Sequence, residues 1–347
     1  MKRWRVRPEG SNWGEFGDDD QRGRMNLLTP SKVMEGIAEV REGQTFCLSL
    51  PLDYPGGTTL NPRRLPPALR PGIRNGKPFF LYQMNQEDPA YTDVFNDDLV
   101  VMHLQYSTQW DSLAHVGALF DTDGKGVAKP VFYNGYRGGD DIVGPADRSG
   151  AGIDPAMEFR STSSATRLGI ENLAAACVQG RGVMIDVRAH LGSASRVVGY
   201  DDLMQIIEAD KLEIRPGDMV CIHTGFAQLI LDMGKEIDLP RLRANEPGLD
   251  GRDQRLLNWI TDSGIVCLIS DNEAVERRTP CSADQCAALP LHEHCLFKLG
   301  VHLAELWLLT PLANWLRAYH RTAFLLTAPP LRLPGAVGSP VTPVATV

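Results

Sequence analysis

The sequence predicts an α/β fold in which some strands pair in parallel. From residue 181 onward, short apolar runs typical of buried strands alternate with amphipathic stretches typical of helices. Strands separated by helices of roughly ten residues favour parallel pairing through crossover connections. The chain has 347 residues without an internal repeat or a clear linker, so residues 1–347 are interpreted as one domain.

The beginning of the chain is interpreted as an arm. Residues 1–40 are polar and rich in Gly and Asp, and they lead into a predicted helix over residues 31–40. Thr29 or Ser31 is the predicted N-cap, because hydroxyl oxygens accept hydrogen bonds from the free N–H groups of a first helical turn. A strand is predicted next, over residues 45–50.

A long loop rich in Pro, Arg and Gly covers residues 54–78. Loops of this length in compact domains are typical of functional lids or of arms that contact another subunit. Residues 98–112, "DLVVMHLQYSTQWDS", are predicted to form one strand that runs into a turn.

The second half of the chain contains the alternating elements. The predicted strands cover residues 181–187, 217–225, 265–271 and, as the final strand, 322–331. The predicted helices cover residues 200–210, 226–234, 252–264, 289–300 and 311–321, with Gly264 and Gly300 as stop signals. The tail over residues 328–347 is apolar between its Pro and Gly residues, so we expect it to pack on the body of the domain.

Composition limits the classes of partner. The net charge of −8 argues against nucleic acid and anionic membranes, and no run of about eighteen apolar residues predicts a membrane span. The basic first residues lack the apolar segment of a secretory signal, so a cytoplasmic location is expected. The seven cysteines are scattered and mostly lie in apolar stretches, which favours buried thiols over disulfides: Cys47, Cys177, Cys221, Cys267, Cys281, Cys286 and Cys295.

Chemistry-bearing residues concentrate in "QYSTQWDSLAH", residues 105–115. Side chains two apart on a strand share a face, so Gln109 and Asp111 are expected to point the same way. A turn after Asp111 would bring His115 back over that face. A carboxylate beside an imidazole can activate water, with or without a metal. The alternative is a polar turn in which Asp111 caps a helix and His115 lies on the surface.

A second cluster, "LHEHCLFKLGVHLAEL", holds His292, His294, His302 and Glu305. It is not a zinc-binding HExxH motif, because Leu296 stands where the second histidine is needed. His292 and Glu305 lie on different predicted elements and can meet only through tertiary structure. The alternative is an amphipathic helix with solvated His294 and His302.

Three further acidic or histidine residues lie at predicted strand ends: Asp186, His223 and Asp271. Such positions often line ligand crevices in α/β sheets, and they serve equally often as helix caps. The sequence has no phosphate-binding GxxxxGK[ST] loop, no GxGxxG after a strand and no GxSxG nucleophile elbow.

Several segments in order resemble the cyclase family, which contains bacterial kynurenine formamidase and isatin hydrolase. They are "SNWGEFGDDDQRGRMNLLTP", "STQWDSLAH", "GDMVCIHTG", "LHEHCLFKLGVHLAEL" and "PLRLPGAVGSPVTPVA". The resemblance implies a swivelling β/β/α-type α/β fold with a mixed sheet, a homo-oligomer (dimer or tetramer), and metal-dependent hydrolysis of an amide or lactam.

The family motif HxGTHxDxPxH places its two metal-binding histidines on Gln105 and Gln109, its aspartate on Asp111 and its acid/base histidine on His115. Its C-terminal metal ligands match His292, with His294 as the other register, and Glu305. Amide oxygens are poorer zinc ligands than imidazole. Three arrangements follow: one Mn²⁺, Zn²⁺ or Mg²⁺ held by Asp111, His292 and Glu305 with help from Gln105 and Gln109; His103 as a substitute ligand; or no metal.

We therefore expect a hydrolase that cleaves a C–N bond of an amide, lactam or related cyclic small molecule. His115 is the expected general acid/base, Asp111 the metal ligand or orienting group, and Gln105, Gln109 and Trp110 the substrate contacts. One alternative is a metal-free cyclase, lyase or isomerase that uses the same pocket. Another is a binding protein that has lost catalysis.

Overall fold

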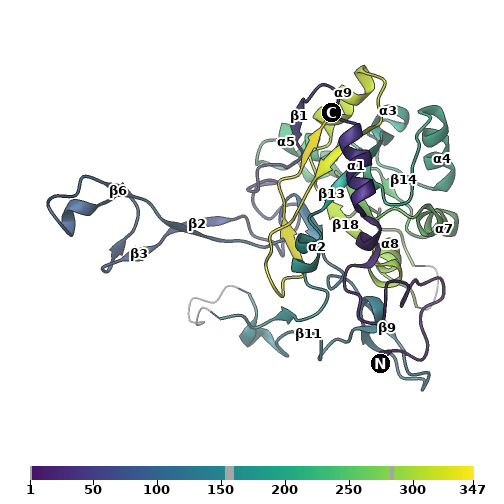
Figure 1. Cartoon of the computed structure of the whole chain (residues 1–347), viewed down its shortest axis with the longest axis horizontal. Coiled ribbons are helices and arrows are strands. Elements are labelled where there is room, and N and C mark those ends of the chain that lie inside the picture. Colours follow the sequence, from purple (N-terminus) through teal and green to yellow (C-terminus); the bar gives the residue numbers. More distant parts are fainter. Residues whose placement is uncertain (1, 153–159, 282–284) are drawn as a thin grey trace.

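The computed structural model describes residues 2–152, 160–281 and 285–347. Its centre is a curled mixed sheet with helices on both faces, from which a long hairpin-like arm projects (Figure 1). The strands of this sheet are, in spatial order, β1 (Thr45–Cys47), β21 (Val344–Thr346), β19 (Ala323–Thr327), β13 (Gln179–Ile185), β15 (Met219–Ile222), β17 (Cys267–Ser270), β18 (His302–Glu305), β8 (Gln109–Asp111) and β20 (Gly338–Pro340).

The four central strands β13, β15, β17 and β18 pair in parallel, and the strands on either side pair antiparallel. This confirms the predicted α/β fold with a mixed sheet. The helices are α1 (Pro30–Ala38), α2 (Glu171–Ala175), α3 (Val187–Leu191), α4 (Tyr200–Ala209), α5 (Phe226–Asp232), α6 (Leu239–Arg243), α7 (Gln254–Ser263), α8 (Pro290–His292) and α9 (Thr310–Ala318). The shorter turns are η1 (Gly23–Leu27), η2 (Met84–Gln86), η3 (Tyr133–Gly135), η4 (Arg148–Gly150) and the π-helix η5 (Glu293–Leu299).

Hydrophobic side chains cover both faces of the sheet. On β15, Val220 and Ile222 join a core cluster that includes residues of α4 and α7, whereas Met219 and Cys221 join a second cluster that includes α9. Strands buried on both faces have near-continuous apolar sequences, which explains why their ends are the places where polar side chains collect. Among the described helices, none combines the length and apolar character that a membrane span requires.

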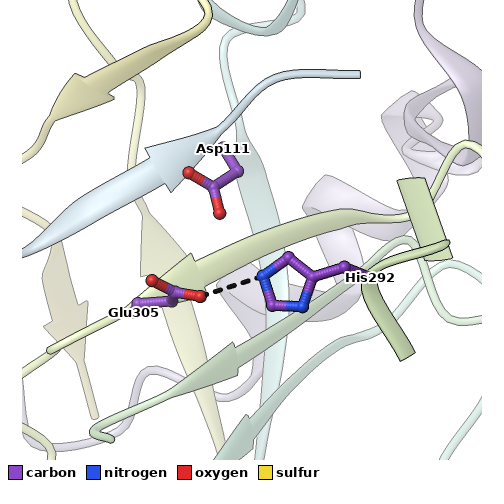
Figure 2. A group of neighbouring side chains, drawn as sticks. All are labelled: Asp111, His292 and Glu305. Carbon is purple, nitrogen blue, oxygen red and sulfur yellow. Dashed lines mark hydrogen bonds and ion pairs between the residues drawn. The ribbon is translucent and has the colours of Figure 1, made fainter. Parts of the chain in front are cut away.

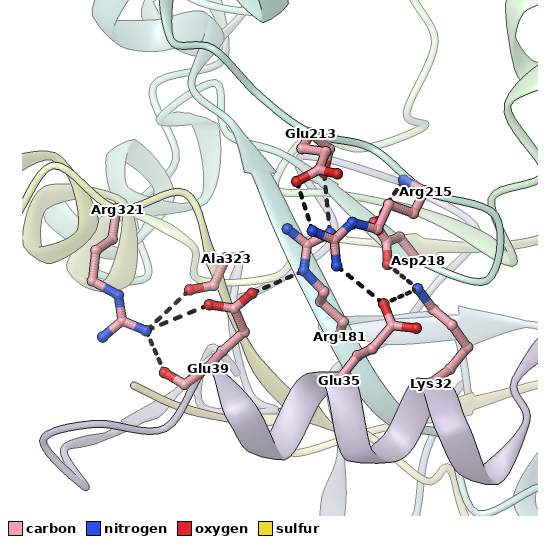
Figure 3. A network of polar contacts seen from close by, with 9 residues as sticks. All are labelled: Lys32, Glu35, Glu39, Arg181, Glu213, Arg215, Asp218, Arg321 and Ala323. Atoms are coloured by element: carbon pink, nitrogen blue, oxygen red, sulfur yellow. Dashed lines mark hydrogen bonds and ion pairs between the residues drawn. The ribbon is translucent and has the colours of Figure 1, made fainter.

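Helix α1 lies directly on β13. A Cβ added at Gly36 would come within 2.6 Å of the backbone carbon of Gly180, so the close approach requires glycine at the crossing point. Beside it, a network of charged side chains joins α1 to β13 and β15 (Figure 3). Its buried centre is Asp218, which contacts Lys32 at 2.9 Å and Arg181 at 2.6 Å.

The region predicted as a loop over residues 54–78 forms part of the projecting arm (Figure 1). The single strand predicted over residues 98–112 is wrong, because it is two strands: β7 (Asp98–Val101) in the arm and β8 in the main sheet. The arm strands pair as β2 (Ala68–Pro71) with β7, β3 (Ile73–Arg74) with β4 (Lys77–Pro78), and β5 (Tyr82–Gln83) with β6 (Val94–Phe95).

The tail contributes two strands that the sequence did not predict, so the strand over residues 322–331 is not the last one. β20 pairs with β8 and β21 pairs with β19 and β1. The remaining small pairs are β9 (Ala118–Phe120) with β10 (Lys129–Val131), β11 (Ile142–Val143) with β12 (Ser164–Ala165), and β14 (Val197–Val198) with β16 (Gly248–Leu249).

The prediction of buried thiols holds for Cys221, Cys267 and Cys295, which are buried, and is wrong for the other cysteines. Cys281 and Cys286 form a disulfide, and their Cα atoms lie 6.2 Å apart, within the usual range for such a bond. The remaining two, Cys47 and Cys177, are exposed.

Candidate active site

Strand β8 supplies one wall of the site. Its side chains alternate, so Gln109 and Asp111 lie on one face and Trp110 on the other. Antiparallel pairing with β18 places Glu305 opposite Gln109. The Gln109 amide nitrogen donates to Glu305 Oε2 at 2.9 Å and contacts Asp111 Oδ1 at 3.4 Å, so both carboxylates share one amide group.

His292, on α8, extends toward these two carboxylates. The chain turns back at Gly300, which ends η5 in the left-handed conformation, and re-enters the sheet as β18. Asp111, His292 and Glu305 therefore converge from three elements (Figure 2). His292 Nε2 lies 3.2 Å from Glu305 Oε1, and one ligand atom from each of the three residues lies within 4.8 Å of the others.

A buried carboxylate behind the cluster, Glu276, holds His292 in place. Its Oε1 is 2.8 Å from His292 Nδ1 and accepts a hydrogen bond from the His292 backbone N–H, while its Oε2 accepts one from the N–H of Leu291. A carboxylate on Nδ1 fixes the imidazole so that Nε2 faces the cluster, as in many metal sites. Sequence reasoning missed Glu276, because nothing near "AVERR" connects it with position 292.

The cluster holds more negative charge than its surroundings neutralise. Burial and the nearby charge of Asp111 raise the pKa of Glu305 to about 7, although His292 opposes this shift. Burial alone would lower the pKa of His292, but its hydrogen bonds to Glu276 and Glu305 outweigh that and raise it to about 10. Two carboxylates this close favour a proton or a cation between them.

His115 stands beside the cluster without joining it. It lies in a turn after β8, where its N–H donates to the carbonyl of Ser112, and its Nε2 is 3.8 Å from Asp111 Oδ1. About a quarter of its side chain (24%) is exposed. Burial lowers the pKa of His115 below the ordinary imidazole value, and the charge of Asp111 offsets only part of that shift. The imidazole is therefore neutral at pH 7 and able to accept a proton.

A cavity of about 730 Å³ opens onto these groups. Its lining includes His115, His292 and Glu305, together with residues near the base of the arm and a wall that carries Glu276. The volume suits a small organic molecule. The reactive side chains therefore face a space that a substrate can enter.

The donor set fits a divalent cation. Asp111 Oδ2 and Gln109 Oε1 are buried and have no hydrogen-bond partner in the described part of the chain, a costly state for polar atoms. Two carboxylates and one imidazole suit Mn²⁺, Zn²⁺ or Mg²⁺, with the oxygen ligands favouring the harder ions. Asp111, His292 and Glu305 would hold the ion. Gln109 would add an oxygen only if its amide turned over, since its nitrogen now faces both carboxylates.

Three other residues expected in the site have different surroundings. Gln105 belongs to a turn before β8, and its amide lies against Gly338 of β20. His103 precedes that turn and is absent from the one group of metal-binding side chains found among the described residues. The side chain of Trp110, expected to contact substrate, is fully buried on the other face of β8, packs edge-on against Trp307 and donates to the carbonyl of Ala328.

The alternative for the second cluster, a helix with a solvated histidine face, is wrong. His294 is buried, with Nε2 2.9 Å from Thr261 Oγ1, and His302 is buried on β18. In the structure His292 faces the site, and its neighbour His294 points toward α7. The helix predicted over residues 289–300 is mostly a π-helix, which shifts the faces that a regular α-helix would present.

The strand-end residues Asp186, His223 and Asp271 form a different cluster. His223 Nδ1 is 2.8 Å from Asp186 Oδ1, and its Nε2 is 2.9 Å from Thr310 Oγ1. Asp271 accepts hydrogen bonds from the backbone N–H groups of Thr224 and Gly225. These residues cap and join elements of the domain.

A family model described as "Putative cyclase" matches residues 48–277, more than half of the chain. A solved structure described as a novel cyclase is 31% identical, with a TM-score of 0.72, and the match covers 97% of this chain and 99% of that one. No curated protein sequence matches the chain.

Two isatin hydrolases share the fold at 14% identity. One, from Labrenzia aggregata and bound to benzyl benzoate, has a TM-score of 0.54 and covers 91% of this chain and 97% of its own. The other, from Ralstonia solanacearum, has a TM-score of 0.53 and covers 87% and 91%. The arrangement of the main sheet is therefore shared with these two proteins.

Proposed function

The chain belongs to the cyclase family, and on that premise we propose that it is a metal-dependent hydrolase of a C–N bond in an amide, lactam or related cyclic small molecule. The observation that carries the proposal is the convergence of Asp111, His292 and Glu305 beside His115 at one cavity. The shared fold of the isatin hydrolases supports the same class of reaction.

The roles of the side chains follow from their positions. A divalent cation bound by Asp111, His292 and Glu305 would polarise a carbonyl group and lower the pKa of water. Glu276 holds His292 with Nε2 toward that position. Gln109 donates to Glu305 and contacts Asp111, which keeps the two carboxylates together.

His115 is the proton carrier in this proposal. Its lowered pKa leaves the ring neutral, so it can accept a proton from water as water attacks the carbonyl carbon. It can then return that proton to the nitrogen as the C–N bond breaks. The product of a lactam would carry a carboxylate and an amine.

One observation favours a second candidate, a metal-free cyclase, lyase or isomerase. The amide nitrogen of Gln109 reaches both carboxylates, and the raised pKa of Glu305 allows a proton to occupy the pair. Such a site needs no cation to remain neutral. Glu305 would then supply or remove a proton together with His115.

One experiment separates the two candidates. The full chain, purified without chelators, is analysed for bound metals and assayed on a panel of amides, lactams and isatin before and after EDTA. Activity that disappears with the metal and returns with Mn²⁺ or Zn²⁺ supports the hydrolase. Full activity in a metal-free preparation would favour the metal-free candidate.

A further inference from the structure

Charged side chains of both signs line the cavity of the candidate site, and its arginines outnumber its glutamates although the protein has a net charge of −8. Five arginines line it: Arg63, Arg64, Arg243, Arg277 and Arg278. The metal-binding proposal uses none of them. Arginine is the side chain best suited to bind a carboxylate through two parallel hydrogen bonds. An arginine of this cavity that the protein itself does not hold is therefore a candidate to bind a substrate carboxylate.

Two of these arginines are already held by the protein. Arg243 lies between two carboxylates, 2.8 Å from Glu246 and 2.7 Å from Glu273. Arg277 donates to Ser195 and to the carbonyl of Glu246. Their guanidinium groups fix the cavity wall, so they are not the best candidates for a ligand.

Arg64 differs from Arg243 in having no acidic partner, and it differs from both arginines in its position. One of its nitrogens donates to the carbonyl of Gln105, just before β8. No carboxylate pairs with it within the ranges that the structure describes. It lines the same cavity as His115 and Glu305, so it lies beside the reactive groups.

The charges of the inner site leave this arginine uncompensated once a cation is bound. A divalent ion would balance the carboxylates of Asp111 and Glu305, and Glu276 is already occupied with His292. Arg64 would then be a positive charge beside the reactive centre to which no carboxylate of the described structure is hydrogen-bonded. A single anchored nitrogen leaves the rest of the guanidinium free to meet an incoming anion.

We propose that Arg64 binds a carboxylate of the substrate, and that the substrate class is therefore an amide or lactam that carries a carboxylate away from the scissile bond. This inference rests on the proposed function and adds the substrate's charge to it. When that carboxylate belongs to the acyl part of an amide, or when the substrate is a lactam, hydrolysis leaves one product with two carboxylates, the new one near the metal ligands and the original one at Arg64.

The test uses product-like probes, so that it needs no turnover. Binding of isophthalate and benzoate, and of glutarate and butyrate, is measured by calorimetry on the full chain with and without Mn²⁺. In each pair the second carboxylate is the main difference. We expect at least one dicarboxylate to bind roughly tenfold more tightly than its monocarboxylate partner, as one charge-assisted hydrogen-bonded pair allows.

Variants identify the residue responsible. Arg64→Met should bring the preferred pair to equal affinity, and Arg64→Lys, which keeps the charge without the fork, should retain part of the preference. Arg70→Met, on an exposed arm strand, is the matched control and should leave the preference unchanged. Thermal unfolding of each variant verifies that it is folded.

The outcomes also separate this inference from the proposed function. A dicarboxylate preference that survives in Arg64→Met, or no preference in any pair, would overturn the carboxylate site whatever the metal assay gives. Equal weakening of both members of a pair in Arg64→Met would also overturn it, because Arg64 would then act on the shared group. Loss of metal dependence with an Arg64-dependent preference would overturn only the hydrolase.

Discussion

Two buried clusters combine histidine with carboxylates in the described part of this protein, and they differ in how completely their polar groups are hydrogen-bonded. In the first, His292 contacts Glu276 and Glu305, and Oδ2 of the nearby Asp111 has no hydrogen-bond partner among the described residues. In the second, His223 lies between Asp186 and Thr310 with both ring nitrogens engaged.

In the second cluster an arginine side chain also balances the carboxylate. Arg317 donates to Asp186 Oδ2 at 2.6 Å, and burial, which would raise the pKa of that carboxyl, is outweighed by His223 and Arg317, so the pKa falls to about 2. The first cluster has the opposite electrostatics, because the pKa of Glu305 rises to about 7. The same residue types therefore stabilise the fold at one place and leave a site ready for a cation at the other.

The largest expected effect is on catalysis. His115→Ala should lower turnover by roughly 10²–10⁴, the usual contribution of a general acid/base. The other histidine in the described cavity lining, His292, cannot replace it because Glu276 and Glu305 engage both of its ring nitrogens. Steady-state kinetics on a substrate found in the amide panel would measure it. His223→Gln serves as the matched control, and comparable losses from both changes would contradict the distinction between the clusters.

The two carboxylates that hold a histidine, Glu276 and Asp186, should differ in their effect on metal affinity. Glu276→Gln should weaken Mn²⁺ or Zn²⁺ binding by roughly 10–100-fold, because the amide no longer holds His292 as a carboxylate does. Asp186→Asn, the equivalent change behind His223, should leave metal affinity as it is. Calorimetric titration of the metal-free chain measures both variants, and an unchanged affinity in Glu276→Gln would remove that residue from the site.

Lowering the pH should destabilise the protein through the second cluster. The pKa of Asp186 falls from 3.8 to about 2 on folding, so its ionised form stabilises the protein above pH 4. That contribution, about 2 kcal/mol, is lost as the pH falls from about 4 to about 2. Urea unfolding at several pH values, compared with Asp186→Asn, isolates it. Parallel pH curves for the two proteins would show that Asp186 is not the group responsible.

Part of the fold and of the candidate site could be predicted from the sequence. The parts that could not be predicted depend on contacts between distant segments. Strand alternation correctly placed Gln109 beside Asp111, and the periodicity of the second half gave the α/β fold. The same alternation puts Trp110 on the opposite face, in the core, although Trp110 was expected to contact substrate. Local patterns cannot show which distant segments meet.

Glu276 and Arg64 were therefore missed. Glu276 contacts His292 across 16 positions of the chain, and Arg64 reaches the carbonyl of Gln105 across 41. Neither residue belongs to a polar run with the groups it serves. The buried position of His294 was missed for a related reason, because a π-helix presents faces that regular helical spacing does not describe. His302 lies after that helix, on β18, where distant strands bury it.

The smallest expected effect is a change in the free energy of unfolding, and its sign should differ between the two clusters. Asp111→Asn in the metal-free chain should raise stability by about 1 kcal/mol, because it removes a buried charge that opposes ionisation of Glu305. Asp186→Asn should lower stability, because it removes the charge that His223 and Arg317 face. Thermal unfolding of both variants in EDTA measures the signs. A destabilised Asp111→Asn would mean that the first cluster is as well satisfied as the second, and that a cation is not needed to balance it.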